Sequence, residues 1–119
     1  MPWGWPSIRL VRYREVGGRL GERAVLLDGV PASTIHDGGR IRFGPDGLLY
    51  LSTGDASTTS LSQDLDSVAG KILRLNRDGT APRDNPFGSL LYSFCTNNRD
   101  GRGSPGASDD RIARLVPAS

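Results

Sequence analysis

The sequence has few of the residues that build disulfide frameworks and thiol chemistry. Its 119 residues include one cysteine, Cys95, and one histidine, His36. A lone cysteine cannot form a disulfide within the chain, and no histidine lies near it in the sequence to favour a thiolate. We therefore exclude a disulfide-stapled fold and expect Cys95 to take no part in chemistry.

Strong charge and long apolar runs are also lacking. The formal net charge is +2, from 15 basic and 13 acidic residues. Arginines alternate along short segments, as Arg12 and Arg14 do and as Arg40 and Arg42 do, which is typical of solvated strand faces. No dense basic cluster with aromatic residues is present, so we expect no nucleic-acid binding. No apolar stretch is long enough to cross a bilayer, so we expect no membrane insertion.

The beginning of the sequence gives no targeting signal. The first ten residues, MPWGWPSIRL, lack the basic and apolar regions of a secretion signal. Two alternatives follow: either the protein is cytoplasmic, or its targeting segment is missing from this sequence. The localisation therefore stays undetermined.

Glycine and proline are plentiful. The sequence has 16 glycines and 8 prolines, together 24 of 119 residues, while 36% of residues are hydrophobic. With nearly balanced charges, this composition does not favour disorder. The length suits one domain. We expect a folded chain with many turns.

The apolar residues recur with the period of β-strands. Between residues 40 and 43 (RIRF) the alternation is strict, and an apolar run follows at 48–52. Gly44-Pro45-Asp46-Gly47 between them predicts a hairpin turn, because proline presets φ and Gly47 accepts a left-handed conformation. Strands are predicted over residues 8–14, 23–28, 40–43, 48–52 and 71–76.

Two further patterns are a long polar segment and an internal repeat. Residues 56–69 are polar and rich in serine and threonine, which predicts a long surface loop; residues 62–70 could hold one helical turn, but no full helix is predicted. Residues 10–18 resemble residues 72–80, at a separation of 62 residues. A repeat on this scale, with hairpins and no helices, favours an all-β propeller, whose blades have four antiparallel strands.

Local sequence alone leaves the role of His36 open. Beside Asp37 at the start of a strand it could be a catalytic base or an ordinary turn residue. Asp46 and Asp55 have glycine neighbours and are predicted to be turn residues. Lys71, at the start of a strand, is predicted to be solvated rather than a cofactor ligand.

A specific resemblance covers about half of the chain. Its motifs are HDGGR (36–40), GPDGLLY (44–50), TGD (53–55), AGKILRL (69–75) and DNP (84–86). In this order they resemble the soluble quinoprotein glucose/sorbosone dehydrogenases, also called aldose sugar dehydrogenases. The resemblance implies a partial β-propeller, about two blades of a six-bladed parent fold, with residues 1–94 forming the propeller-like domain.

The resemblance also implies a chemistry. The parent enzymes hold pyrroloquinoline quinone (PQQ) and Ca²⁺, and they oxidise the anomeric carbon of an aldose by hydride transfer to the quinone while calcium polarises the cofactor. The histidine of the motif is their general base, and it corresponds to His36. Gly38 and Gly39 would let the backbone approach a flat cofactor. Full-length relatives of this kind are usually periplasmic or secreted.

The similarity ends after Phe94. The arginine that grips the quinone in the family corresponds to Asn97, and the following family asparagine to Asn98, which is our candidate cofactor-binding residue. Residues 95–119 are predicted to be a divergent, disordered tail. Either a frameshift near Phe94 or a deletion explains them; the deletion would place Pro105 near a calcium-binding turn and Asp110 near the substrate.

Two functional alternatives remain at this level. In the first, the chain is a fragment of a quinoprotein sugar dehydrogenase that is inactive alone because its site is incomplete. In the second, it is a non-enzymatic binding or scaffold propeller in which His36 is structural. In both, unpaired sheet edges predict self-association, because a propeller blade normally packs against two neighbours.

Overall fold

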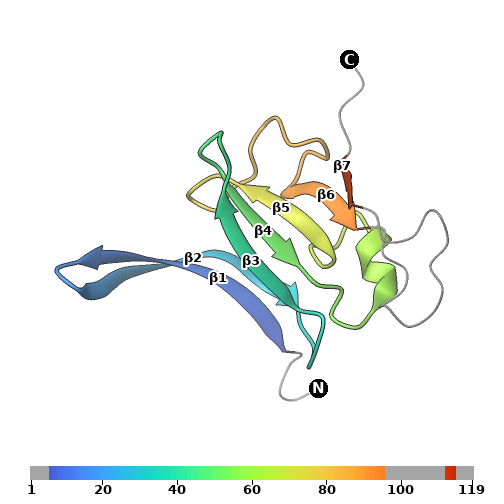
Figure 1. Cartoon of the computed structure of the whole chain (residues 1–119), viewed down its shortest axis with the longest axis horizontal. Helices are drawn as coiled ribbons and strands as arrows, with labels where there is room; N and C mark the ends of the chain where they lie inside the picture. Colours follow the sequence, from blue (N-terminus) through green and yellow to red (C-terminus); the bar gives the residue numbers. More distant parts are fainter. Residues whose placement is uncertain (1–5, 96–111, 115–119) are drawn as a thin grey trace.

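The protein is an antiparallel all-β structure. The computed structural model describes residues 6–95 and 112–114. Strands β1 (Ser7–Val16) and β2 (Arg19–Pro31) form a two-stranded sheet, and five strands form a second sheet in sequence order (Figure 1). The five are β3 (Gly38–Phe43), β4 (Leu49–Thr53), β5 (Lys71–Leu75), β6 (Leu91–Cys95) and β7 (Ile112–Arg114). The five predicted strands are confirmed, whereas β6 and β7 were not predicted.

Helical structure is minor in the part of the chain that is described. The loop between β4 and β5 contains one short 3-10 helix, η1 (Thr59–Gln63). It begins earlier than the helical turn allowed at residues 62–70. No helix among the described residues is long and apolar enough to cross a membrane.

The core lies on one face of the five-stranded sheet. Along β4, buried Leu49, Leu51 and Thr53 alternate with half-buried residues, as expected when successive side chains point to opposite faces. Leu49 pairs with Leu75 and Leu51 with Leu73, so leucines of neighbouring strands lie side by side. The buried cluster consists of Leu10, Leu49, Leu51, Leu73, Leu75 and Leu91.

The β1–β2 hairpin packs on this core at one end only. Leu10 belongs to the core, and the Arg12 guanidinium donates a hydrogen bond to the carbonyl oxygen of Arg77 at 2.9 Å. Gly79 has φ +89°, and a side chain there would overlap the Leu26 carbonyl. The remainder of the hairpin projects away from the sheet (Figure 1). Its exposed apolar residues are Tyr13, Val16, Leu20 and Val25. Self-association through such surfaces stays a prediction.

The two segments of the predicted repeat occupy different positions. Strands β1 and β5 both begin the similar segments, but β1 has β2 as its neighbour in a two-stranded sheet. Strand β5 instead lies inside the larger sheet, between β4 and β6. In this chain the two similar segments therefore lie in different sheets.

The predicted turn between β3 and β4 is confirmed. Gly47 has φ +76°, and its N–H donates to the Gly44 carbonyl at 3.0 Å. Asp46 accepts a hydrogen bond from the Leu48 N–H at 3.0 Å, which is the turn role predicted for it. Asp46 also accepts from the Tyr50 hydroxyl at 2.8 Å, so the turn is tied to β4.

A buried arginine joins this turn to the loop before β6. Arg74 is 8% exposed, and its guanidinium group donates to Asp46 at 3.1 Å, to Asp84 at 2.7 Å and to the Asn85 side-chain oxygen at 3.0 Å. Asn85 in turn donates to the Arg74 carbonyl at 2.9 Å. The guanidinium carbon of Arg74 also lies over the aromatic ring of Tyr92, 5.7 Å from the ring centroid. The DNP motif at residues 84–86 is thus structural in this fold.

These contacts predict a loss of stability in acid. The hydrogen bond from the Leu48 N–H, with those from Tyr50 and Arg74, holds the pKa of Asp46 below its usual value. The hydrogen bond from Arg74 does the same to the pKa of Asp84. A carboxyl whose pKa is depressed by folding stabilises the protein above the unfolded pKa, and this contribution is lost as the pH falls through the folded pKa.

The expected result is a urea midpoint that is constant near pH 6 and falls below about pH 4, the ordinary range for aspartate. Asp84→Asn, which keeps the shape but not the charge, should flatten this fall. An equally steep fall in Asp84→Asn would show that the contact between Arg74 and Asp84 does not cause it.

Candidate active site

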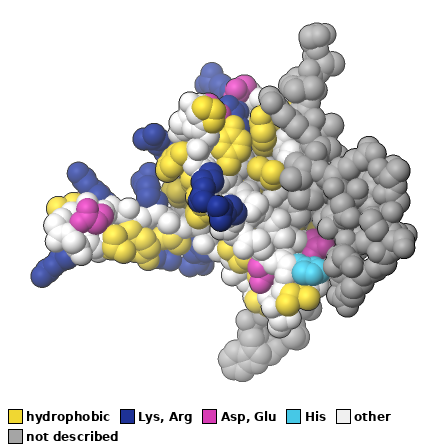
Figure 2. Space-filling model, viewed as in Figure 1, with side chains coloured by type: hydrophobic (Ala, Val, Ile, Leu, Met, Phe, Trp, Pro, Cys, Tyr) yellow, Lys and Arg dark blue, Asp and Glu magenta, His cyan; other side chains and the backbone are white. Residues whose placement is uncertain are grey.

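His36 and Asp55 meet at one end of the five-stranded sheet. Strands β3 and β4 are antiparallel, with Gly38 opposite Thr53, so the residues before β3 lie beside those after β4. His36 Nδ1 is 3.1 Å from Asp55 Oδ1. Figure 2 shows the histidine side chain at the surface with an acidic side chain near it. The sequence predicted the histidine but not its partner.

Gly54 allows the two loops to approach so closely. Its N–H donates to the Asp37 carbonyl at 3.0 Å, and the Ala56 N–H donates to the His36 carbonyl at 3.0 Å. A Cβ atom on Gly54 would overlap the His36 carbonyl oxygen. Glycine is therefore required beside the pair, because any side chain would push His36 away from Asp55.

The backbone of the pair is held in an unusual conformation. His36, Ala56 and Ser57 have φ of 65°, 52° and 62°, in the left-handed region that residues with side chains seldom adopt. Asp55 Oδ1 accepts the Ser57 N–H at 2.9 Å, and this bond supports the turn. Such conformations cost free energy and cluster at functional sites. The turn role predicted for Asp55 is thus confirmed, and the same oxygen also contacts His36.

The environment of His36 suits proton transfer. The side chains of His36 and Asp55 are 33% and 15% exposed, so the ring is neither sealed in the core nor fully solvated. A carboxylate can only accept, so the neutral imidazole carries its proton on Nδ1. Nε2 then has a free lone pair. A histidine oriented by a carboxylate in this way can accept a proton on Nε2, so the predicted role of His36 as a base stays a prediction.

The glycines that follow His36 have different roles. Gly38 has φ +71°, and a Cβ there would lie 2.8 Å from the Gly54 nitrogen, so this glycine serves the packing of β3 against β4. At Gly39 a Cβ would meet no atom of the described residues within 4 Å. Among the described residues, the backbone at Gly39 is therefore open on the side of its missing side chain, and the backbone at Gly38 is not.

Lys71 corrects one sequence prediction. We expected a solvated side chain, but Lys71 is fully buried, and its ammonium group donates to the carbonyls of Leu61 at 2.7 Å and Ala69 at 2.8 Å. Because alternate side chains of a strand point to the same face, Lys71 lies on the core-facing side of β5 with Leu73 and Leu75.

The loop after Asp55 packs tightly against the end of β5. A Cβ on Gly70, which has φ +65°, would lie 2.8 Å from the Ser62 Cα in η1. The Thr53 hydroxyl donates to the Val68 carbonyl at 2.6 Å and accepts the Lys71 N–H at 3.0 Å. The predicted surface loop is therefore bonded to the sheet on the side of Asp55.

The remaining candidates for cofactor and metal binding are not placed. Asn98, the predicted cofactor-binding residue, lies outside the described residues, as do Asn97, Pro105 and Asp110. Among residues 6–95 and 112–114 no group of three or more histidine, cysteine or acidic side chains could hold a metal ion.

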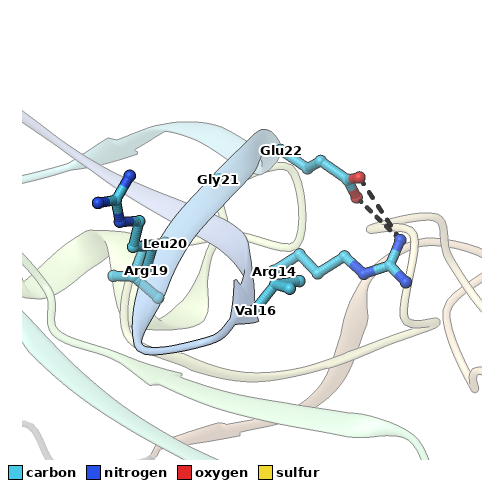
Figure 3. A pocket seen from close by; sticks show the side chains of 6 residues that line it. All are labelled: Arg14, Val16, Arg19, Leu20, Gly21 and Glu22. Carbon is cyan, nitrogen blue, oxygen red and sulfur yellow. Dashed lines mark hydrogen bonds and ion pairs between the residues drawn. The ribbon is translucent and has the colours of Figure 1, made fainter.

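A separate hollow of about 200 Å³ lies at the tip of the β1–β2 hairpin (Figure 3). The Arg14–Glu22 ion pair beside it is 3.4 Å long and about two-thirds exposed, 68% and 70% for the two side chains. Exposed ion pairs of this kind contribute little. The hollow is lined by Arg14, Val16, Arg19, Leu20, Gly21 and Glu22, with no histidine among them, so we place the candidate site at the sheet end.

Comparison with known proteins gives the family. Residues 4–101 match the family model "Glucose / Sorbosone dehydrogenase", which is most of the chain. The chain belongs to the glucose/sorbosone dehydrogenase family. Among its relatives, quinoprotein glucose dehydrogenase B of Acinetobacter calcoaceticus is 30% identical over 117 residues, which cover 81% of this chain and 24% of that protein. Aldose sugar dehydrogenase YliI of Escherichia coli is 42% identical over 52 residues, covering 44% and 14%.

A solved relative supports the fold. The PQQ-bound aldose sugar dehydrogenase of Streptomyces coelicolor is 46% identical, with a TM-score of 0.66, over 72% of this chain and 28% of that chain. The predicted fold class, part of a β-propeller, is therefore confirmed. The chain spans about a quarter of the length of the Acinetobacter and Streptomyces proteins. The boundary predicted at residue 94 stays a prediction.

Proposed function

We propose that this chain is the part of a PQQ-dependent aldose dehydrogenase that supplies the general base. The observation that carries the proposal is the contact between His36 Nδ1 and Asp55 Oδ1 in a ring that stays one-third exposed. Family membership supports the same conclusion, since a relative binds PQQ and is an aldose sugar dehydrogenase.

The chemistry of the pair follows from its geometry. Asp55 holds the Nδ1 proton, so Nε2 would accept the proton of the anomeric hydroxyl group of an aldose. The carboxylate then stabilises the imidazolium that forms. PQQ, when bound, would supply the two-electron acceptor for the hydride from the anomeric carbon.

The described residues fit only part of such a site. They provide the base and, at Gly39, a backbone without a side chain. They provide no cluster for calcium, so we assign it no step. Asn98 remains the candidate for contact with PQQ. We therefore expect the chain to be inactive alone.

A chimera tests the proposal. Residues 6–95 would replace the matching segment of the Streptomyces coelicolor enzyme, and turnover of an aldose would be followed with an artificial electron acceptor, PQQ and Ca²⁺. We expect turnover in the chimera and a loss of at least about 100-fold in its His36→Ala variant, the usual contribution of a general base. Asp55→Asn should also lose turnover, because an amide does not stabilise the imidazolium and can favour the tautomer that carries its proton on Nε2.

A control variant of the chimera separates loss of the base from general damage to the protein. Leu20→Ala, at the exposed hairpin tip, serves as the control for nonspecific damage and should leave turnover unchanged. Full turnover in folded His36→Ala would refute the proposal and favour the scaffold alternative.

A further inference from the structure

The Lys71 side chain is an internal cation held by main-chain carbonyl groups. It is fully buried, and its ammonium group contacts the carbonyl oxygens of Leu61 and Ala69. A buried ammonium is tolerated only when hydrogen bonds replace its hydration. These two carbonyls belong to the loop between Asp55 and β5, so the side chain fixes the loop from inside.

One series of hydrogen bonds runs from Lys71 to Asp55. The ammonium donates to the Leu61 carbonyl at 2.7 Å, the Leu61 N–H donates to the Thr58 carbonyl at 3.0 Å, and the Thr58 N–H donates to the Asp55 carbonyl at 2.9 Å. Each bond joins one turn of the loop to the next. Movement of Leu61 would therefore be transmitted to the backbone of Asp55.

A second series reaches the residue before Asp55. Lys71 donates to the Ala69 carbonyl at 2.8 Å, and the neighbouring Gly70 N–H donates to the Gly54 carbonyl at 2.7 Å. Gly54 in turn donates to the Asp37 carbonyl at 3.0 Å. Both sides of Asp55 are thus tied to the position of one ammonium group.

We propose that Lys71 is a positioning residue for the His36–Asp55 pair. By fixing the loop it keeps Asp55 Oδ1 in hydrogen-bonding distance of His36 Nδ1 and so selects the tautomer with a free Nε2. The effect of Lys71 on catalysis rests on the proposed function, in which His36 is the general base. The geometric coupling itself needs no substrate or cofactor.

The single histidine allows a direct test. In the untagged full chain, nitrogen NMR of the imidazole at pH 8 reports one ring, His36. We expect the Nδ1–H tautomer to predominate in the wild type, because Asp55 accepts that proton. Lys71→Met keeps the length of the side chain but removes its donors, so the Nδ1–H form should fall to a minority.

Arg74→Met is the matched control. Arg74 is also a buried cation of β5, but its bonds go to Asp46, Asp84 and Asn85. This variant should lose stability and keep the Nδ1–H tautomer. Lys71→Gln retains an amide donor and should restore part of that tautomer relative to Lys71→Met.

The outcomes separate this inference from the function. A folded Lys71→Met with the wild-type tautomer overturns the inference, as does loss of the tautomer in Arg74→Met to the same extent. If neither Lys71 variant folds while Arg74→Met does, Lys71 acts in folding and the inference also fails. An inactive chimera with intact tautomer coupling would remove only the proposed function.

Discussion

Gly54→Ala is expected to abolish the His36–Asp55 contact and to destabilise the chain by about 4 kcal/mol, more than is typical of overpacking. The added methyl group would overlap the His36 carbonyl oxygen, which is main chain and cannot rotate away. Relief requires separation of the two loops and loss of the hydrogen bonds that join Gly54 to Asp37 and Ala56 to His36. Small domains have only about 5–15 kcal/mol to lose.

Urea unfolding and the His36 NMR signal measure the two effects. Gly21→Ala is the control, because a Cβ at Gly21 would meet no atom within 4 Å in the part of the chain that the structure describes, and its φ is not left-handed. It should leave both the midpoint and the signal unchanged. If Gly54→Ala had the stability of Gly21→Ala, the close approach of the loops would be disproved.

Leu73→Ala is expected to cost about 2–5 kcal/mol, the usual range for leucine in a well-packed core. Leu73 is fully buried at the centre of β5 and lies opposite Leu51 of β4 and Leu91 of β6. Its removal leaves a cavity between three strands. Since Leu73 lies in the buried leucine cluster of the five-stranded sheet, we expect loss of the cooperative unfolding transition.

Leu20→Ala is the matched comparison, because Leu20 is 68% exposed. Circular dichroism during thermal unfolding should show a change within about 0.5 kcal/mol for this variant. Equal destabilisation by the two substitutions would mean that the leucine cluster is not the centre of stability.

Local chemistry in the sequence predicted much of the sheet. The Gly44–Gly47 turn and the flanking alternation correctly gave the β3–β4 hairpin, because turn geometry and strand period act over a few residues. The partner of His36 was missed, although a signal existed. Residues 36 and 55 lie at nearly equal distances from this turn, so antiparallel pairing brings them together.

Other features depended on contacts that are distant in sequence. The burial of Lys71 follows from the alternation Lys71, Leu73, Leu75, but a charged residue at a strand start gave the opposite expectation. The role of Arg74 needed the loop at residues 84–85 to be placed beside it. Strand β7 pairs with β6 across an intervening segment, so no local pattern indicated it.

Lys71 is the single lysine of the sequence, and the structure withholds its amine from solvent. An acylating reagent can therefore reach this amine only after the surrounding strands and loop have opened. Acylation of Lys71 would then measure the fraction of molecules in which this part of the fold has opened.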